Sequence, residues 1–400
     1  SPSMGQFYAM PGNPGIAEHA DLVEGIPLSA HDTLVTFCVD HGIEFVVIGP
    51  EAPLVAGLVD RLNAAGIPAF GPTAAAARLE GSKLFTKELC RANRIPTAAF
   101  GRFSEFEPAA AYVKAQGAPI VVKADGLMAG KGVVVALTVE EAESAIEQVF
   151  ASGGTEVLIE EFMEGEEASL FALVDGETVL PFGSAQDHKR AFDGDLGPNT
   201  GGMGAYSPAP ALTPELEARA INEILIPTAK AMVKAGTPYR GVLYAGLMLT
   251  AEGPKLVEYN CRFGDPECQV LMPRFAGDLL EALHATATGR LADVTPQWSD
   301  DAAMTVVYAS RGYPGPHQTG SVISGIDEAR AGDGVLVFFA GTRMKGDDLV
   351  SNGGRVLNIT GTGKDLAEAR ARAYGAIEKI RWPDGFYRTD IGWRALTRQD

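Results

Sequence analysis

The chain has 400 residues, of which 33 are basic and 51 are acidic, so its formal net charge is −18 at pH 7. This balance argues against a partner such as nucleic acid or an anionic membrane, because both require a basic surface. Hydrophobic residues make up 46% of the chain and charged residues 21%, which excludes a disordered protein. The length predicts two to four domains, and no apolar run approaches the roughly 20 residues of a membrane span.

Four cysteines (Cys38, Cys90, Cys261 and Cys268) lie far apart or singly in the sequence. They do not form the close pairs of a zinc knuckle, and lone thiols in so large a chain indicate a reducing, cytoplasmic environment. No signal peptide is evident. The chain opens with Ser1 rather than Met and reaches a strand-like segment by residue 7. We therefore expect that a leading segment is missing.

Residues 1–77 alternate short apolar strands, at 7–10, 44–49 and 69–72, with helices at 33–41 and 54–65. Such alternation predicts a parallel sheet with helices on both faces. Ligands of these sheets bind beyond the carboxyl ends of the strands. The turns at 11–15 and 49–53 are expected at that edge.

Residues 78–297 begin with a helix at 83–93 and then form a lid subdomain at about 98–163, with strands at 119–124, 133–137 and 157–162. Within the lid, Thr138 and Glu141 form a capping box for a helix that ends near residue 150. Further strands follow at 168–174 and 178–182, then a helix at 213–234 and a strand pair at 241–250 and 255–260. Residues 298–400 contain three strands and a helix at 365–380, which predicts a small α+β lobe.

A glycine-rich loop at 123–132 lies between two predicted strands and has lysines at its start and near its end. Glycines let backbone N–H groups approach phosphate oxygens, and a lysine neutralises their charge. The spacing differs from that of a Walker loop, and a strand rather than a helix follows. The alternative is an ordinary flexible hairpin that carries surface lysines.

The segment 257–267 combines Glu258, Asn260 and Arg262 on one face of a predicted strand. Carboxylate and amide oxygens are ligands that Mg²⁺ prefers, and an arginine can bind a phosphoryl group. A solvated strand face with a charge pair is the alternative. It is the weaker interpretation, because a Gly-Asp-Pro turn follows an otherwise apolar strand.

Two further segments are candidate ligand sites. The basic run 187–190 precedes the glycine cluster 197–204, and together they offer an anion site in an otherwise acidic protein. The acidic run 160–167 follows an apolar strand, so its backbone can meet a nucleobase and Glu167 can meet ribose hydroxyls. Taken alone, His188 is more often a surface residue, the glycine run a loop and the glutamates a solvated surface.

Together these segments resemble the phosphoribosylamine–glycine ligase family of the ATP-grasp superfamily. The matching segments also include 81–83, 352–356 and 387–393, so the resemblance covers almost the whole chain. It implies an α/β chain with an ATP-grasp fold, an N-terminal parallel-sheet (pre-ATP-grasp, Rossmann-like) domain and the C-terminal α+β lobe. The first strand and glycine-rich loop of that family are missing from this sequence, which would weaken binding of phosphoribosylamine.

The resemblance implies an ATP-dependent ligase of purine biosynthesis. It would join glycine to 5-phosphoribosylamine through glycyl phosphate, with Mg²⁺ or Mn²⁺ as cofactor and as a monomer or weak homodimer. The implied catalytic residues are Lys123, Asp187, Lys189, Arg190 and Arg262, and the metal ligands are Glu258 and Asn260. The implied ATP-binding residues are Lys83, Lys123, Gly130, Lys131, Gly132, Glu160, Glu161, Phe162, Met163 and Glu167. The implied substrate-binding residues are Gly12, Asn13, Pro14, Gly15, Pro50, Glu51, Asp187, His188, Lys189, Arg190, Asn199, Thr200, Gly201, Gly202, Met203 and Asp265.

Two alternatives stay open beside this interpretation. One is another ATP-grasp enzyme, such as a different carboxylate–amine ligase or a biotin-dependent carboxylase subunit, against which the segments 187–190 and 197–204 argue. The other is a nucleotide sensor without catalysis. A sensor predicts loss of the lysines or of the metal pair, yet Lys83, Lys123, Glu258 and Asn260 are all present.

Overall fold

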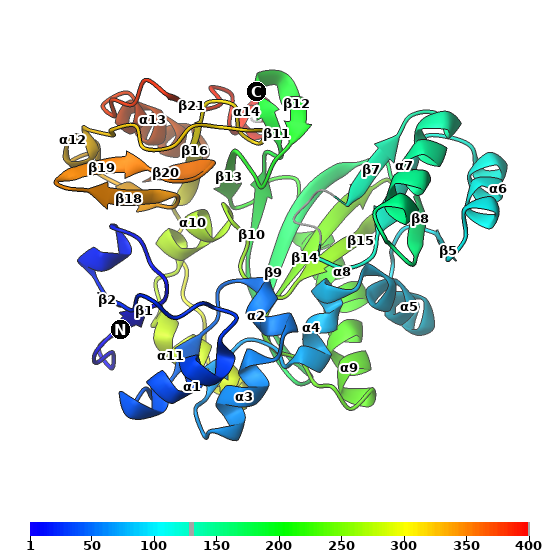
Figure 1. The fold of residues 1–400 in the computed structure, drawn as a ribbon, viewed down its shortest axis with the longest axis horizontal. Coiled ribbons are helices and arrows are strands. Elements are labelled where there is room, and N and C mark those ends of the chain that lie inside the picture. The colour runs from blue at the N-terminus through cyan, green and yellow to red at the C-terminus, as the bar shows by residue number, and fades with distance from the viewer. Residues whose placement is uncertain (128–131, 399–400) are drawn as a thin grey trace.

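The computed structural model describes residues 1–127 and 132–398 (Figure 1). In the N-terminal part, β1 (Tyr8–Ala9) pairs in parallel with β2 (Asp21–Leu22), and β3 (Val46–Val47) pairs in parallel with β4 (Ala69–Phe70). The strands are parallel, as predicted, but they form two separate two-stranded sheets. The remaining elements of this part are η1 (Ile16–Glu18), α1 (His31–Asp40), α2 (Glu51–Val55), α3 (Leu58–Ala64) and α4 (Ala74–Gly81).

The predicted helix at 54–65 is wrong as a single element, because α2 and α3 take its place. Gly57 separates them with φ of +83°, a left-handed conformation that a glycine adopts without steric cost. This break lets α2 begin at Glu51, directly after the turn at 49–53. Glu51 is therefore the first residue of α2, and its carboxylate lies near the Arg262 guanidinium.

The lid is a four-stranded antiparallel sheet with the strand order β5-β8-β6-β7. Its elements are β5 (Phe100–Phe103), α6 (Phe106–Gln116), β6 (Ile120–Ala124), β7 (Val133–Ala136), α7 (Val139–Ala151) and β8 (Val157–Glu161). Thr138 caps α7 as predicted, because its hydroxyl accepts from the Glu141 N–H at 3.2 Å. The Glu141 carboxylate accepts from the Leu137 N–H rather than from Thr138 itself.

One face of the lid sheet is covered by α6 and α7, and the other face carries Lys123 and Glu160. Ile120 and Val122 of β6 and Ile159 of β8 pack into a core with the two helices. Because side chains alternate along a strand, Lys123 and Glu160 point to the opposite face. Figure 1 shows this sheet at one side of the molecule, where its free face turns toward the central strands.

The largest sheet has the strand order β15-β14-β9-β10-β13-β16-β20-β17, and β21 pairs with β16. It joins the predicted ATP-grasp part to the C-terminal part without a break, because β13 pairs with both β10 and β16. Its strands are β9 (Glu166–Asp175), β10 (Thr178–Asp187), β13 (Gly204–Ser207), β14 (Arg240–Thr250), β15 (Gly253–Asn260), β16 (Ala302–Ser310), β17 (Val335–Phe339), β20 (Arg355–Gly363) and β21 (Gly385–Phe386). The C-terminal lobe is thus an extension of the central sheet.

Helices and short hairpins complete the fold. The predicted helix at 213–234 forms as α8 (Pro214–Ala220), a π-helical turn (Ile221–Leu225) and α9 (Ile226–Lys234). The turn lies just before Pro227, whose ring lacks the N–H that a regular α-helix would use. The other elements are α5 (Lys83–Asn93), β11 (Arg190–Phe192), η2 (Asp193–Asp195), β12 (Leu196–Asn199), α10 (Cys268–Leu271), η4 (Met272–Arg274), α11 (Leu279–Ala287), η5 (Leu291–Asp293), α12 (Ile326–Arg330), β18 (Thr342–Lys345), β19 (Asp348–Ser351), α13 (Leu366–Ile377) and α14 (Trp393–Thr397).

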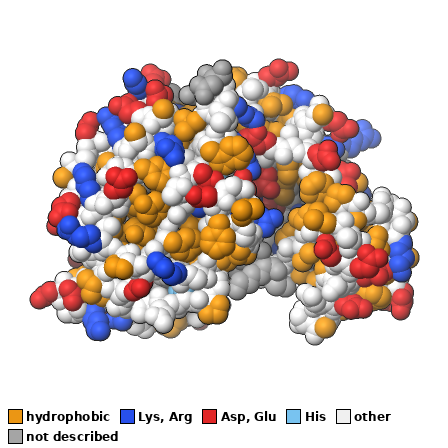
Figure 2. All heavy atoms as spheres, turned by 90° about the horizontal axis from the view of Figure 1, so that it is seen from above, with side chains coloured by type: hydrophobic (Ala, Val, Ile, Leu, Met, Phe, Trp, Pro, Cys, Tyr) orange, Lys and Arg blue, Asp and Glu red, His pale blue; other side chains and the backbone are white. Residues whose placement is uncertain are grey.

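Seen from above, the surface is hollowed between the lid and the larger remainder of the molecule, and charged side chains lie in the hollow (Figure 2). The main hydrophobic cores lie on either side, one within the lid and the others around the central sheet. Across the described ranges, no helix is both long enough and apolar enough to cross a membrane.

Candidate active site

Two lysines share the Glu160 carboxylate where the lid meets the rest of the molecule. The Lys123 ammonium, at the end of β6, lies 2.9 Å from one carboxylate oxygen, and that of Lys87, on α5, lies 2.9 Å from the other. All three side chains are buried. The Glu160 side chain, predicted to line the adenine, therefore faces the two lysines instead of open space.

The start of the glycine-rich loop is fastened to the first turn of α5. Lys83 donates from its ammonium to the Gly126 carbonyl at 2.8 Å, and Ser82 donates to the Asp125 carboxylate at 3.0 Å. Burial lowers the pKa of Lys83, although the nearby Glu258 charge opposes this. Two predicted ATP-binding residues, Gly130 and Lys131, lie outside the described residues. Gly132 accepts through its carbonyl from the Ala124 N–H at 2.8 Å.

The segment after β8 reaches the surface of the hollow. Glu161 and Phe162 are exposed, and Met163 is half-buried. The Glu161 carboxylate lies 3.7 Å from the Lys255 ammonium on β15. The exposed Phe162 ring is thus accessible for contact with a planar group.

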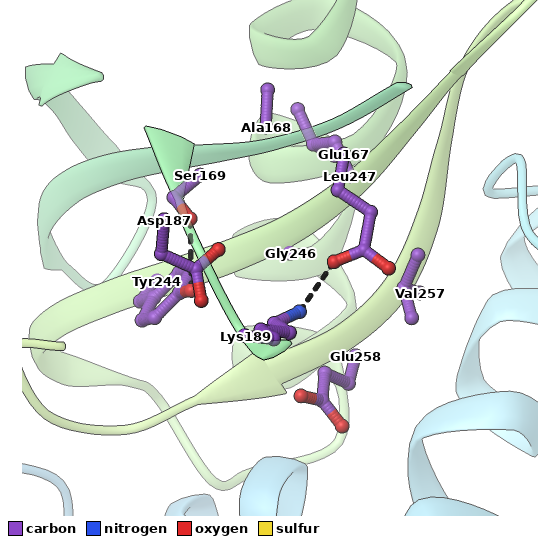
Figure 3. A pocket seen from close by; sticks show the side chains of 10 residues that line it. All are labelled: Glu167, Ala168, Ser169, Asp187, Lys189, Tyr244, Gly246, Leu247, Val257 and Glu258. Atoms are coloured by element: carbon purple, nitrogen blue, oxygen red, sulfur yellow. Dashed lines mark hydrogen bonds and ion pairs between the residues drawn. The ribbon is translucent and has the colours of Figure 1, made fainter. Parts of the chain in front are cut away.

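A pocket lies between the central strands β9, β10, β14 and β15 (Figure 3). The Lys189 ammonium forms an ion pair with Glu167 inside it, and Asp187 and Glu258 face the same space. Burial raises the pKa of Asp187 to about 7, with the Lys189 charge opposing and nearby Glu267 adding to the rise. Burial would lower the pKa of Lys189, but the surrounding carboxylates outweigh it and raise the pKa well above its usual value.

A bulge in β15 positions the predicted metal ligands. Gly246 pairs with Glu258 whereas Leu247 pairs with Leu256, so Val257 is the extra residue. Beyond the bulge, Glu258 and Asn260 point to the same face, as predicted.

The Glu258 and Asn260 side chains suit a hard divalent cation. In the parts of the chain that the structure describes, neither side chain takes part in a hydrogen bond or ion pair, so their oxygens are available. Within the same ranges there is no cluster of three or more His, Cys, Asp or Glu residues that could hold a metal. Two oxygen ligands from the protein, completed by water and substrate phosphates, are the usual arrangement for Mg²⁺.

Arg262 is held between two acidic residues of the N-terminal part. Its guanidinium lies 3.3 Å from the Glu51 carboxylate and 3.5 Å from that of Glu80. Glu80 also accepts from the Cys261 N–H at 2.7 Å, and its burial raises its pKa to about 7 despite the Arg262 charge. Glu51, predicted to contact substrate, therefore contacts Arg262, while Pro50 beside it is exposed.

The basic run 187–190 divides between the pocket and the C-terminal part. Lys189 lines the pocket, but the buried His188 ring accepts from the Gly392 N–H at 3.0 Å. Arg190 is exposed and donates to the Gly197 carbonyl at 2.8 Å. Thr200 donates to the Lys189 carbonyl through its hydroxyl at 2.9 Å, and Asn199 is exposed at the end of β12.

Arg355 connects the glycine cluster to Asp265 by hydrogen bonds to both. Its guanidinium donates to the carbonyls of Gly201 and Asp265 at 2.9 and 2.6 Å, to that of Gly202 at 3.4 Å, and pairs with the Asp265 carboxylate at 3.0 Å. Met203, predicted to contact substrate, is fully buried in a small core.

The turn at 11–15 is docked on the C-terminal part. Asn13 donates through its side-chain amide to the Phe339 carbonyl at 2.6 Å. A Cβ at Gly15 would lie 2.7 Å from the Phe339 ring, so only glycine permits this approach. Gly12 has φ of +85°, and Pro14 is half-buried. The turn therefore joins the N-terminal part to β17 of the C-terminal part.

Several residues that shape the site do not figure in the sequence prediction of site residues. They are Lys87, Glu80, Asp125 and Arg355. Lys87 follows Lys83 by one helical turn, so the i,i+4 spacing indicates that both lie on one face of α5. Asp125 and Arg355 belong to the segments 123–132 and 352–356 that the sequence already indicates, but the partners of Glu80, Asp125 and Arg355 come from distant segments, which local sequence does not show.

Family models match the chain in three consecutive stretches. They describe the N domain (residues 1–80), the ATP-grasp (A) domain (81–268) and the C domain (303–394) of phosphoribosylglycinamide synthetase. Relatives named phosphoribosylamine–glycine ligase from Mesorhizobium japonicum and Rhizobium meliloti are 57% and 56% identical over 403 residues. These alignments cover 100% of this chain and 94% and 95% of the relatives.

Solved structures give the same result. The phosphoribosylamine–glycine ligase of Thermotoga maritima superposes with a TM-score of 0.84 at 34% identity, covering 96% of this chain and 93% of that one. The biotin carboxylase domain of the Hydrogenobacter thermophilus 2-oxoglutarate carboxylase superposes with a TM-score of 0.69 at 19% identity, covering 92% and 82%, which shows a shared fold alone. The predicted ATP-grasp fold is therefore confirmed, and the chain belongs to the phosphoribosylglycinamide synthetase family.

Proposed function

We propose that this chain joins glycine to 5-phosphoribosylamine and converts ATP to ADP and phosphate, giving glycinamide ribonucleotide for purine biosynthesis. The observation that carries this proposal is the identity of 50–57% to bacterial relatives named phosphoribosylamine–glycine ligase, over the full length of the chain. The site geometry supports it, because Lys83 and Lys123 lie at the start of the glycine-rich loop while Glu258 and Asn260 present carboxylate and amide oxygens on β15.

The reaction needs activation of a carboxylate, because its oxygen leaves poorly when an amine attacks. The glycine carboxylate attacks the γ-phosphate of ATP and forms glycyl phosphate, and ADP leaves. The amine of phosphoribosylamine then attacks the acyl carbon, and phosphate leaves. The protein contributes mainly by positioning the reactants and by neutralising phosphoryl charge.

The nucleotide phosphates would contact cations on the lid side of the hollow. Lys83 is the first residue of α5 and donates to the Gly126 carbonyl of the glycine-rich loop, and Lys123 lies near the end of β6 beside Glu160. The exposed segment 161–163 would line the adenine. Glu167 would meet the ribose after exchanging its present partner, the Lys189 ammonium.

Glu258 and Asn260 would hold the divalent cation, for which we propose Mg²⁺ or Mn²⁺. When bound, such an ion neutralises charge on the phosphates and orients them. Arg262, kept in place by Glu51 and Glu80, would stabilise the transferred phosphoryl group. Lys189 would bind the glycine carboxylate, and Asp187 the glycine amine.

The phosphoribosylamine pocket would be built from the glycine cluster 199–204, Asp265 and the turn at 11–15. Arg190, which is exposed, would reach the substrate phosphate. His188 and Met203 would support this pocket from behind, because both are buried.

We also propose that the enzyme works in the cytoplasm as a monomer or weak homodimer and binds no nucleic acid. The net charge of −18 supports the last point. The four cysteines are free thiols, which suits a reducing compartment.

A coupled assay for ADP tests the proposal. With glycine, ATP, Mg²⁺ and freshly prepared phosphoribosylamine, ADP should form only when both other substrates are present. Glu258→Gln should lower kcat by a factor of about 10³ while the protein stays folded, because it removes charge from the metal site. ADP formation that ignores phosphoribosylamine, or that prefers another amine, contradicts the proposal.

A further inference from the structure

The buried cluster of Lys87, Glu160 and Lys123 contains one cation more than the nucleotide contacts require. Lys123 and Glu160 belong to the lid, and their positions beside the nucleotide are part of the proposed function. Lys87 lies on α5, beside Glu160, and its side chain is 3% exposed. Nothing in the reaction calls for a direct contact between Lys87 and a substrate.

Lys87 is anchored to the body of the molecule rather than to the lid. Its ammonium donates to the Thr97 hydroxyl at 2.7 Å, and that hydroxyl donates to the Leu256 carbonyl of β15 at 2.7 Å. The helix α5 that carries Lys87 packs against α9 and β15. Lys87 is therefore a fixed cation against which the Glu160 carboxylate of the lid is held.

The two lysines use different oxygens of Glu160. Lys87 faces Oε2 and Lys123 faces Oε1, each at 2.9 Å. Within the described residues, Oε1 makes no hydrogen bond of good geometry, so Lys123 is attracted to Glu160 without a directed bond. Two ammonium groups and one carboxylate leave one net positive charge at a buried position, where charges are poorly screened.

We propose that Lys87 is a positioning residue for the nucleotide phosphates: it engages Glu160, so that the charge of Lys123 remains available to the phosphates. Without Lys87, Glu160 and Lys123 form a neutral pair, and the lid strand presents no net charge. Burial lowers the pKa of Lys87, and the Glu160 charge opposes that shift, as expected for an ammonium held by this contact. The inference rests on the proposed function only in taking a nucleotide as the ligand.

A purely structural tie between α5 and β8 is the competing explanation. It predicts that loss of Lys87 lowers stability and leaves the affinity for phosphates unchanged. Charge balance makes a different prediction for a pair of substitutions. In Lys87→Met the remaining pair of Glu160 and Lys123 has a net charge of zero. In the double variant Lys87→Met with Glu160→Gln, the positive charge of Lys123 is no longer neutralised.

The test compares wild type, Lys87→Met, the double variant and Lys114→Met. Lys114 is the matched control, because it pairs with Glu143 on the exposed surface of the same lid. The KM for ATP, kcat and the melting temperature are measured for each protein. Competitive inhibition by tripolyphosphate reports the phosphate contacts, and inhibition by adenosine reports the base contacts.

Lys87→Met should raise the KM for ATP and the inhibition constant of tripolyphosphate by about tenfold, the effect of weakening one charge-assisted contact. Adenosine inhibition and kcat should change little. The double variant should recover most of the tripolyphosphate affinity, and Lys114→Met should match wild type in every measurement.

Unchanged tripolyphosphate inhibition in folded Lys87→Met would overturn the inference, as would a double variant that binds no better than the single one. An inactive wild type would instead count against the proposed function, so the two failures are distinguishable. If Lys87→Met does not fold, Thr97→Val serves as a milder variant. It should raise the tripolyphosphate inhibition constant without affecting adenosine, and no change would equally overturn the inference.

Discussion

Two clusters in this protein place two cations on one carboxylate, and they differ in what the cations do. In the lid cluster, Lys87 and Lys123 face Glu160. In the C-terminal cluster, Arg388 and Arg394 face Asp195, at 3.0 and 2.6 Å. The first cluster lies where the lid meets the rest of the molecule, and the second joins η2, between β11 and β12, to Arg388 and to α14.

The hydrogen bonds explain the difference. Arg388 is fully buried and bonds both oxygens of Asp390, one oxygen of Asp195 and the Arg190 carbonyl. Its planar guanidinium is thereby committed to fixed partners. Lysine presents a compact charge on a flexible stem, so Lys123 can turn toward a ligand. The arginine cluster therefore stabilises the fold, whereas in the lysine cluster the Lys123 ammonium is able to contact a substrate phosphate.

Replacing Arg388 should have the largest effect on stability. Arg388→Met leaves Asp195 and Asp390 without their buried partner, so unfolding free energy should fall by about 3–5 kcal/mol. The KM for ATP, measured on the folded fraction, should change little. Urea unfolding together with the ADP assay checks both points. If Arg388→Met raised the KM for ATP as much as Lys87→Met, the two clusters would not differ in their effect on nucleotide binding, and the comparison would be contradicted.

Asp195 should make the C-terminal cluster sensitive to acid. The His188 ring, 3.7 Å away, and the hydrogen bond from Arg388 hold the pKa of Asp195 well below its ordinary value of 3.8. A depressed folded pKa contributes stability above pH 3.8 that is lost as the pH falls toward the folded value. Asp195→Asn should thus be less stable than wild type at pH 7, and the difference should shrink below about pH 4. If urea unfolding gave the same difference in unfolding free energy between wild type and Asp195→Asn at pH 7 and at pH 3, the depressed pKa of Asp195 would be contradicted.

Thr97→Val should give the smallest effect and sharpen the account of the lysine cluster. It removes one hydroxyl acceptor from Lys87 without changing the shape of the side chain. Loss of a single hydrogen bond of about 1 kcal/mol predicts a rise of a few-fold in the KM for ATP. Thr86→Val is a matched control. Thr86 lies on α5, the helix that carries Lys87, but its hydroxyl donates to the Leu79 carbonyl and not to a group of the lysine cluster. Equal KM values for ATP in the two variants would contradict the proposal that Thr97 helps to position Lys87.

Much of the fold could be predicted from patterns of local sequence. The helix 83–93 begins and ends at the predicted residues, and Thr138 caps its helix. Local patterns failed where a backbone detail or a distant partner decides. Gly57 splits one predicted helix in two, and the local patterns did not indicate that β13 pairs with both β10 and β16.

The site was predicted as a set of segments, but not as a set of contacts. Glu258 and Asn260 share a face because the bulge at Val257 precedes both, which leaves the predicted alternation intact. The sequence could not show that Asn13 binds the Phe339 carbonyl, 326 residues away. It also could not show that Glu51 faces Arg262. Such pairings depend on how domains dock, and a charged residue looks the same in sequence whether it faces a substrate or another side chain.

Activation of the glycine carboxylate by phosphoryl transfer can be followed through its oxygen atoms, because one of them passes to the released phosphate. Glycine labelled with ¹⁸O in both carboxylate oxygens is converted with ATP and phosphoribosylamine, and the released phosphate is examined by mass spectrometry. Glycyl phosphate as an intermediate predicts one ¹⁸O atom in each phosphate released. Unlabelled phosphate, formed at the same rate as glycinamide ribonucleotide, would contradict the account.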